Sequence, residues 1–384
     1  YIIKGIDVEP VASYFKFNPT GAFSVDWYIG KRCNFACSYC VDYLHDYTSP
    51  HVPLENMKKL VDLIYEKEGS NVLWSLTGGE PTLNPKFLDL CAYIREKGRK
   101  YISVTTNGSR TLKYHKDLFD LVDGITQSFH FEFMEQRIDE YIEKFIELDN
   151  YRQELNAKRE KGEPKKTLIL RFMVETGQLE NVERMDKAYR EAGITNIEHR
   201  YIRPPGKDKG KGMQPEEKYN FKDKKDPNQI TDKAKVEKIE TKEASYYGHN
   251  EQGAIKEIYK STADPDKRKL KFWFQDSDKN YHEEDYHYNE LNYDKKNNYE
   301  GWLCWAGLKH LKVTPPGDIY IGSCHVGGKR GNIYDRDSID LPTEPIRCNK
   351  WRCTDNTDLK VPKIKDWEHY HLVKDMIEYG KENS

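Results

Sequence analysis

The chain has 384 residues, with 62 Lys and Arg against 64 Asp and Glu, so its formal net charge is −2 at pH 7. This balance gives no electrostatic footprint for nucleic acid or for an acidic membrane surface. No apolar run approaches the roughly 18 residues of a membrane span, and the N-terminal region lacks the pattern of a secretory signal. We therefore expect a cytoplasmic protein of about two domains that binds neither nucleic acid nor membrane.

From residue 23 onward, strand-like runs alternate with helix-like runs. The expected strands, rich in Val, Ile and aromatic residues, are 23–29, 72–77, 101–105, 124–131, 167–174 and 196–202. The expected helices between them are 54–68, 86–96, about 133–160, and 180–192. Such alternation predicts βαβ units and a parallel sheet. The predicted fold class is α/β, a partial (β/α)6 barrel similar to a TIM barrel, with functional residues at the carboxyl ends of its strands.

Changes in composition suggest the limits of the domains. We expect an N-terminal extension (1–22), the barrel (23–205), a charged Tyr-rich insertion (206–300), a C-terminal cysteine-rich domain (301–360) and a C-terminal helix (361–384). The insertion begins at Pro204-Pro205-Gly206, and residues 270–274 are its compact apolar run. It is interpreted as a lid with a thin core or, alternatively, as a substrate-recognition segment, since long loops are often functional.

Eight cysteines are distributed unevenly along the chain. In chain order they are Cys33, Cys37, Cys40, Cys91, Cys304, Cys324, Cys348 and Cys353. A disulfide framework is typical of small secreted domains, whereas clustered cysteines in a large chain without a signal indicate a metal or catalytic site. The isolated Cys91 lies on an apolar helical face, where a free cysteine behaves as a small buried hydrophobe. A catalytic role for this thiol is the alternative, and it is disfavoured on an outer helix.

The first cluster has the spacing CxxxCxxC directly after the first predicted strand. Thiolates hold iron–sulfur clusters, and three of them leave one iron of a cubane open for chemistry. A zinc site is the alternative, with His45 or His51 as the fourth ligand.

These residues resemble the signature of the radical SAM superfamily, which places an aromatic residue before the last cysteine. The resemblance implies that Cys33, Cys37 and Cys40 bind a [4Fe–4S] cluster whose open iron takes S-adenosylmethionine (SAM). It also implies that Tyr39 lies near the adenine. The implied reaction is reductive cleavage of SAM to a 5′-deoxyadenosyl radical that abstracts hydrogen from a substrate.

Polar residues at the ends of the next strands complete the resemblance. Gly78-Gly79-Glu80 is similar to the family's GGE motif, which binds the methionine amino group: the glycines permit close backbone approach, and Glu80 could accept from a ligand ammonium. Thr105 and Asn107 follow the third strand and are expected near the ribose or methionine part of SAM.

Further candidates come from the fourth and fifth strands. Arg171, inside an apolar strand, suits either the cofactor carboxylate or an internal salt bridge. Ser128, His130 and Glu132 alternate on the fourth strand, so they should share one side and bind cofactor or substrate if that side is the barrel lumen. No catalytic residue is assigned.

The second cluster supplies four thiolates within about 50 residues, enough for a zinc ribbon or a second iron–sulfur cluster. Its context, Gly301-Trp302-Leu303-Cys304-Trp305 and Pro316-Gly317-Asp318 before Cys324, resembles the SPASM/twitch extension of radical SAM enzymes. The resemblance implies that Cys304, Cys324, Cys348 and Cys353 hold one auxiliary [4Fe–4S] cluster that acts in electron transfer.

The expected function is net oxidation of a peptide, by crosslinking or dehydrogenation, with the auxiliary cluster as electron acceptor. Oxidation or epimerisation of a small sugar-like or natural-product substrate is the alternative. A third possibility is that the protein is not an enzyme but a binding protein whose cysteines hold structural zinc. A one-electron donor such as flavodoxin or ferredoxin is the expected protein partner.

Overall fold

The structure is a computed structural model that describes residues 1–3, 5–15, 22–40, 44–174, 178–201, 245–247, 269–287, 291, 296–353 and 355–382. Most of the predicted insertion, residues 206–244 and 248–268, therefore lies outside the described residues. None of the helices in these ranges combines the length and apolar composition that a membrane crossing requires.

Six parallel strands form the predicted barrel sheet. In spatial order they are β3 (Phe23–Tyr28), β4 (Val72–Thr77), β5 (Tyr101–Thr106), β6 (Gly124–His130), β7 (Thr167–Val174) and β8 (Ile197–Tyr201). The strands are β-branched and aromatic, and their side chains alternate between two faces. In β3, for example, Phe23, Val25 and Trp27 are buried, whereas Ser24 and Asp26 are half-buried on the opposite face.

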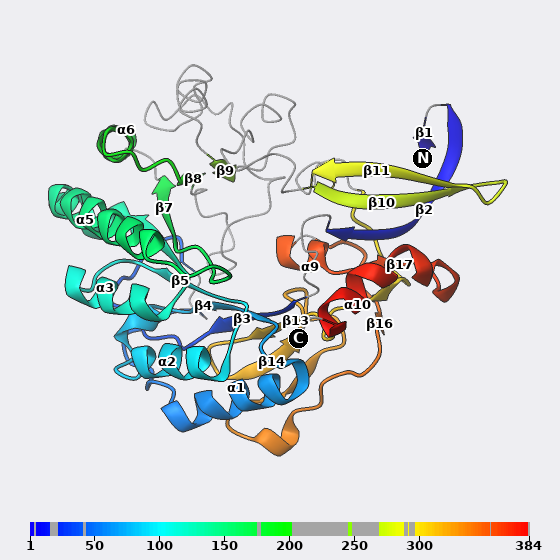
Figure 1. Ribbon diagram of the computed structural model, residues 1–384, viewed down its shortest axis with the longest axis horizontal. Coiled ribbons are helices and arrows are strands. Elements are labelled where there is room, and N and C mark those ends of the chain that lie inside the picture. Colours follow the sequence, from blue (N-terminus) through cyan, green and yellow to red (C-terminus); the bar gives the residue numbers. More distant parts are fainter. Residues whose placement is uncertain are drawn as a thin grey trace.

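Helices cover the apolar face of this sheet (Figure 1). They are α1 (Leu54–Glu68), α2 (Phe87–Lys97), α3 (Leu112–Leu121), α5 (Ile138–Ala157) and α6 (Leu179–Glu191). Phe129 of β6 stacks on Phe172 of β7 and Tyr189 of α6, and all three are fully buried. The polar face of the sheet therefore remains as the lumen of an open barrel, and the predicted partial (β/α)6 barrel is confirmed.

The long helix predicted over about 133–160 is present as α5 (Ile138–Ala157), but its predicted start is wrong. The chain forms the one-turn helix α4 (Phe131–Met134), then η2 (Glu135–Arg137), and only then α5. Phe131 and Met134 are buried in the core beneath α5, which requires the chain to turn before the long helix begins.

The cysteine-rich segment continues the barrel sheet. Strand β13 (His310–Val313) pairs in parallel with β3, and β14 (Asp318–Ile321) and β15 (Lys329–Asn332) follow in antiparallel order. At the other end, β9 (Ser245–Tyr247) pairs in parallel with β8. Among the described strands the sheet runs from β15 to β9 as an open path of ten.

A second sheet joins strands from four segments that the sequence assigns to different domains. It contains β1 (Ile2–Ile3), β2 (Ile6–Phe15), β10 (Lys269–Asp276), β11 (Tyr281–His287), β12 (Leu303–Cys304), β16 (Ile346–Arg347) and β17 (Lys363–Ile364). The apolar run 270–274 lies in β10, which pairs with β2 and β11 (Figure 1). The N-terminal residues and the end of the predicted insertion thus build one unit with the C-terminal segment.

Short helical elements complete the described chain. They are η1 (Pro81–Leu83), η6 (Arg336–Ser338), α9 (Asn356–Lys360), η7 (Trp367–Leu372) and α10 (Lys374–Glu382). The predicted C-terminal helix is therefore preceded by a strand and a 3-10 helix.

Candidate functional site

The three-cysteine loop leaves the carboxyl end of β3. The Cys33 amide donates to the Asp46 carbonyl (2.8 Å), and the Cys40 amide donates to the Cys37 carbonyl (3.0 Å). Burial raises the pKa of Cys33 to about 11 and that of Cys37 to about 12. These thiols are therefore protonated at neutral pH until a bound metal displaces the protons.

Residues at the end of β6 contact this loop. His130 Nδ1 lies 2.6 Å from the Tyr39 hydroxyl and 3.4 Å from Cys37 Sγ. Burial lowers the pKa of His130 to about 4, so its ring is neutral. Glu132 accepts hydrogen bonds from the Ser38 amide (2.8 Å) and hydroxyl, although it lies in α4 rather than on the strand as predicted.

Ser128 lies two residues before His130 on β6 and pairs in register with Arg171. It is buried. Ser128 therefore lies further from the carboxyl edge of the sheet than His130, and His130 and Glu132, but not Ser128, contact the cysteine loop.

The two glycines after β4 lie against the backbone that leads into the cysteine loop. A Cβ on Gly79 would lie 2.3 Å from the Lys31 carbonyl oxygen, and one on Gly78 would lie 2.8 Å from that of Gly30. The Gly79 amide donates to the Gly30 carbonyl (2.8 Å). The close approach of these two backbone segments therefore requires glycine at both positions. This reason is separate from the predicted approach of a ligand to the same glycines.

Glu80 joins the ends of β4 and β5. Its fully buried carboxylate accepts from the amide and hydroxyl of Thr82 (3.0 and 2.6 Å), the Thr106 hydroxyl (2.8 Å) and the Asn107 amide (2.6 Å). Burial raises its pKa, and these donors oppose the shift. Sequence reasoning missed Thr106, whose side chain points to this carboxylate rather than into the lumen.

Asn107 links β5 to the cysteine loop. Its amide nitrogen donates to Asn34 Oδ1 (2.9 Å) and lies 3.9 Å from Cys33 Sγ. Thr105, by contrast, lies on the lumen face of β5 and pairs with Thr126.

Arg171 forms the internal ion pair that was one of its two predicted roles. Its Nε donates to Glu198 Oε2 at 2.7 Å, and the two residues are register partners on β7 and β8. Both side chains are largely buried, at 14% and 10% exposure.

The four C-terminal cysteines lie in one apolar core. Cys304 lies in β12, and the other three lie in turns and loops. Cys304, Cys348 and Cys353 are buried in this core, and Cys324 packs against it. The Ala306 amide donates to Cys304 Sγ, as the Phe35 amide does to Cys33 Sγ (3.4 Å).

Buried polar residues hold these cysteine loops in place. The Asn297 side-chain amide donates to the Cys353 carbonyl (2.5 Å), and the Asn297 backbone carbonyl accepts from the Cys353 amide (2.9 Å). Asp358 accepts from the Cys324 amide (2.6 Å) and the Ser323 amide (2.9 Å). Neither residue was a candidate, because a single Asn or Asp in a polar segment carries no distinctive pattern.

Lys363 places a buried positive charge beside the same cysteines. The residue is 1% exposed, and its ammonium donates to the carbonyls of Asp358 (2.5 Å) and Val361 (2.8 Å). Burial alone would lower the pKa of Lys363, but the nearby Cys353 and Cys304 raise it above its usual value. Four thiols beside a buried ammonium fit an anionic metal cluster.

No three His, Cys, Asp or Glu side chains within the described ranges converge on a single metal-ion position. A cubane cluster places each thiolate on a different iron, so its ligands do not share one ion. Both cysteine sets thus have the donor chemistry of a cluster site.

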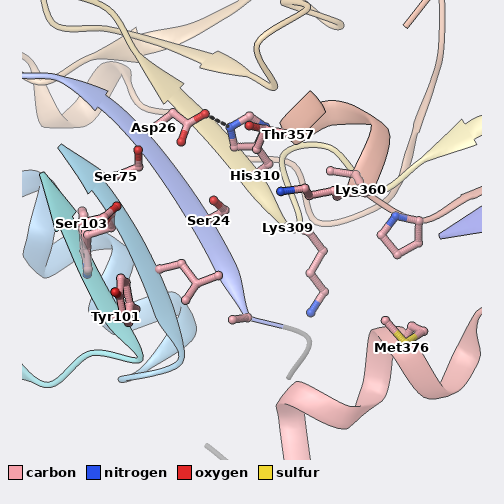
Figure 2. A pocket seen from close by; sticks show the side chains of 15 residues that line it. Ser24, Asp26, Ser75, Tyr101, Ser103, Lys309, His310, Thr357, Lys360 and Met376 are labelled. Atoms are coloured by element: carbon pink, nitrogen blue, oxygen red, sulfur yellow. Dashed lines mark hydrogen bonds and ion pairs between the residues drawn. The ribbon is translucent and has the colours of Figure 1, made fainter. Parts of the chain in front are cut away.

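A cavity of about 380 Å³ lies at the amino-terminal half of the barrel strands (Figure 2). Hydroxyls from three neighbouring strands, those of Ser24, Ser75 and Ser103, line one side. The opposite side comes from Lys360 of α9 and from His310, the first residue of β13. The cavity therefore lies between the barrel and the segment that carries the four cysteines.

Parts of the chain are similar to known protein families and to individual proteins. A family model described as the Radical SAM superfamily matches residues 27–209. GTP 3′,8-cyclase of Pectobacterium atrosepticum is 37% identical over 101 residues, which cover 24% of this chain and 30% of the relative. Fe-coproporphyrin III synthase of Methanosarcina barkeri is 34% identical over 86 residues, which cover 22% and 21%. The matched region is thus less than a third of each relative.

Two solved structures resemble the chain at low sequence identity. His-tagged anSMEcpe with bound AdoMet has a TM-score of 0.47 at 15% identity, covering 82% of this chain and 78% of that one. SuiB of Streptococcus suis has a TM-score of 0.46 at 15% identity, covering 79% and 61%.

The matched residues 27–209 contain the CxxxCxxC loop and nearly all of the six-stranded barrel. The family uses a [4Fe–4S] cluster and SAM, which are therefore cofactors of this protein. The chain therefore contains a Radical SAM domain, which the family model matches over residues 27–209.

Proposed function

We propose that Cys33, Cys37 and Cys40 ligate the SAM-binding cluster at the carboxyl edge of the barrel. When bound, this group supplies the electron that cleaves SAM to methionine and a 5′-deoxyadenosyl radical, which takes a hydrogen atom from the substrate. The proposal is supported above all by one observation: residues that follow β4 and β5 and the last residue of β6 contact this loop, Glu80 through its backbone amide, and Asn107 and His130 through their side chains.

The chain's own residues hold that loop and shape the SAM site. Asn107 fixes Asn34, Glu132 holds the Ser38 amide, and His130 orients Tyr39. The neutral His130 ring packs against Phe35 and Tyr39. Phe35 is buried with Cys33 and Cys37 and stacks on Phe133 (centroids 4.9 Å apart). Thr105, Ser128 and Arg171 line the lumen below and would contact SAM or the substrate.

We assign Cys304, Cys324, Cys348 and Cys353 to one auxiliary [4Fe–4S] cluster. The buried Lys363 ammonium balances its negative charge, and amide donors to sulfur such as Ala306 would tune its reduction potential. In a net oxidation, the substrate radical gives up one electron and one proton, and the auxiliary site accepts that electron. A flavodoxin- or ferredoxin-type donor would supply the electron that cleaves SAM.

The proposed substrate is a peptide, on the resemblance of residues 301–332 to the SPASM/twitch extension. The second candidate is a small sugar-like or nucleotide substrate. It is favoured by the relative named for GTP.

Deuterium transfer separates the two substrate classes. The reduced holoenzyme is incubated with SAM and a deuterated cell extract that has been divided by size into peptide and small-molecule fractions. Deuterium in 5′-deoxyadenosine with the peptide fraction alone supports the proposal. Deuterium with only the small-molecule fraction would replace it with the second candidate. The C33A/C37A/C40A variant is the control and should give none.

A further inference from the structure

A continuous hydrogen-bonded path leads from the cavity to the turn that carries Cys324. Asp26, on β3, lines the cavity, and its Oδ2 lies 3.2 Å from His310 Nε2 (Figure 2). His310 Nδ1 lies 3.0 Å from Asp358 Oδ1. Asp358 in turn accepts the Ser323 and Cys324 amides. Every link joins a side chain to its neighbour within hydrogen-bonding distance.

The path crosses the boundary between two parts of the molecule. Asp26 belongs to the barrel and its side chain is 22% exposed toward the cavity, whereas the side chains of His310 and Asp358 are 1% and 2% exposed. The two flanking carboxylates raise the pKa of His310 to about 10 despite its burial, so the ring is a cation between two anions. Buried charges of this kind are costly unless they are paired, so the three side chains act as one unit.

The surrounding backbone is shaped around Asp358. Gly322 has φ +64°, and a Cβ there would lie 2.6 Å from Asp358 Oδ1. Asp355 caps α9 by accepting the amides of Thr357 (2.8 Å) and Asp358 (3.3 Å), which fixes the carboxylate's position. The turn before Cys324 and the first turn of α9 are therefore held together through a single side chain.

We propose that Asp26, His310 and Asp358 form a positioning network that couples the barrel cavity to the cluster held by Cys324. This inference rests on the proposed assignment of the four C-terminal cysteines to a cluster. Residues that hydrogen-bond to metal ligands orient those ligands. The net charge and the hydrogen bonds around an iron–sulfur cluster set its reduction potential. A charged group that binds in this cavity and contacts Asp26 would thus alter the charge sensed at the auxiliary cluster.

The test isolates the auxiliary cluster. The full chain carrying C33A/C37A/C40A keeps only the four C-terminal cysteines as cluster ligands, and its midpoint potential is measured by redox titration with EPR detection. In this background D26N removes a negative charge and should raise the potential. H310Q removes a positive charge and should lower it. Shifts of the midpoint potential in opposite directions support coupling through charge. If both substitutions merely destabilised the fold around the cluster, the midpoint potential would shift in the same direction in both variants.

Ser24 offers a matched control. It lies on the same face of β3, two residues before Asp26, and lines the same cavity. Ser24 and His310 are register partners on β3 and β13, but the described hydrogen bonds of the His310 ring go to Asp26 and Asp358 and not to Ser24. S24A should leave the potential and the EPR spectrum unchanged. If H310Q fails to assemble a cluster, the more exposed D26N position still decides the outcome.

Two failures are distinguishable. If the triple-cysteine variant retains no iron–sulfur signal, the assignment of the second cluster is wrong. If it retains the cluster but D26N and S24A give the same potential, the cluster assignment stands and the coupling network is refuted.

Discussion

Gly79 and Gly30 lie on facing backbones, yet a side chain would meet very different surroundings at the two positions. A Cβ on Gly79 would lie 2.3 Å from the Lys31 carbonyl oxygen and 2.5 Å from that of Arg32, whereas one on Gly30 would meet nothing within 4 Å. We expect G79A to lower the free energy of unfolding by about 2 kcal/mol through overpacking. We also expect it to slow SAM cleavage, because the displaced backbone leads into the cysteine loop.

Thermal unfolding of the anaerobically prepared protein and a 5′-deoxyadenosine assay would measure both effects. G30A is the control and should resemble the unsubstituted protein. Equal behaviour of the two variants would show that this backbone contact does not position the loop.

The Arg171–Glu198 pair permits a second prediction at the residue scale. E198Q would leave a largely buried guanidinium without its anionic partner, so we expect a loss of stability of about 3 kcal/mol. The double variant R171M/E198M should recover most of this loss, because neither charge then remains. Chemical denaturation of the three proteins measures the difference. A double variant no more stable than E198Q would contradict the ion-pair account and favour another role for Arg171.

The sequence identified residues whose chemistry is rare, but not those that hold them in place. The cysteines, the Gly-Gly pair and the charged Arg171 in an apolar strand are conspicuous in any sequence. Lys363 and Asp358 are not, because their roles arise only when β17 and α9 fold beside Cys304 and Cys324. Asp26, a charge within the apolar run 23–29, was a visible signal that sequence reasoning did not use.

At the scale of elements, the cap of α9 carries a prediction about the auxiliary site. D355A removes the acceptor for two amides and should cost about 1 kcal/mol of stability. Because the freed helix turn contains Asp358, the EPR spectrum of the auxiliary cluster should also change. T111A is a matched control: Thr111 caps α3 by accepting the Tyr114 amide (3.3 Å) and is remote from the four cysteines in the chain.

T111A should lose similar stability without any spectroscopic change. Identical spectra for D355A and the unsubstituted protein would mean that α9 does not position the cluster turn.

The periodicity of the sequence predicts the six barrel strands well, because each is an apolar run bounded by turn residues. It does not predict the second sheet. Pairing of β2 with β10 and of β12 with β17 joins residues far apart in the chain, and strands of two residues such as β17 have no periodic pattern. Long-range pairing of this kind depends on packing that a local pattern does not contain.

At the scale of the whole molecule, two separate cysteine clusters predict the metal content. Anaerobically reconstituted protein should hold about eight irons, and C304A/C324A/C348A/C353A about four. The four-cysteine variant should still cleave SAM, although more slowly in the presence of substrate if the second electron has no acceptor. Iron, sulfide and zinc analysis checks the content. About one zinc per chain in place of four irons would identify the C-terminal site as a zinc staple.

The central claim is that Cys33, Cys37 and Cys40 hold the cluster that cleaves SAM. The most direct measurement is formation of 5′-deoxyadenosine from SAM by the reduced protein under anaerobic conditions. We predict that each of C33A, C37A and C40A abolishes the product, whereas C91A, which alters a fully buried cysteine of α2, leaves it measurable. Product formation that persists in the triple variant C33A/C37A/C40A would contradict the account.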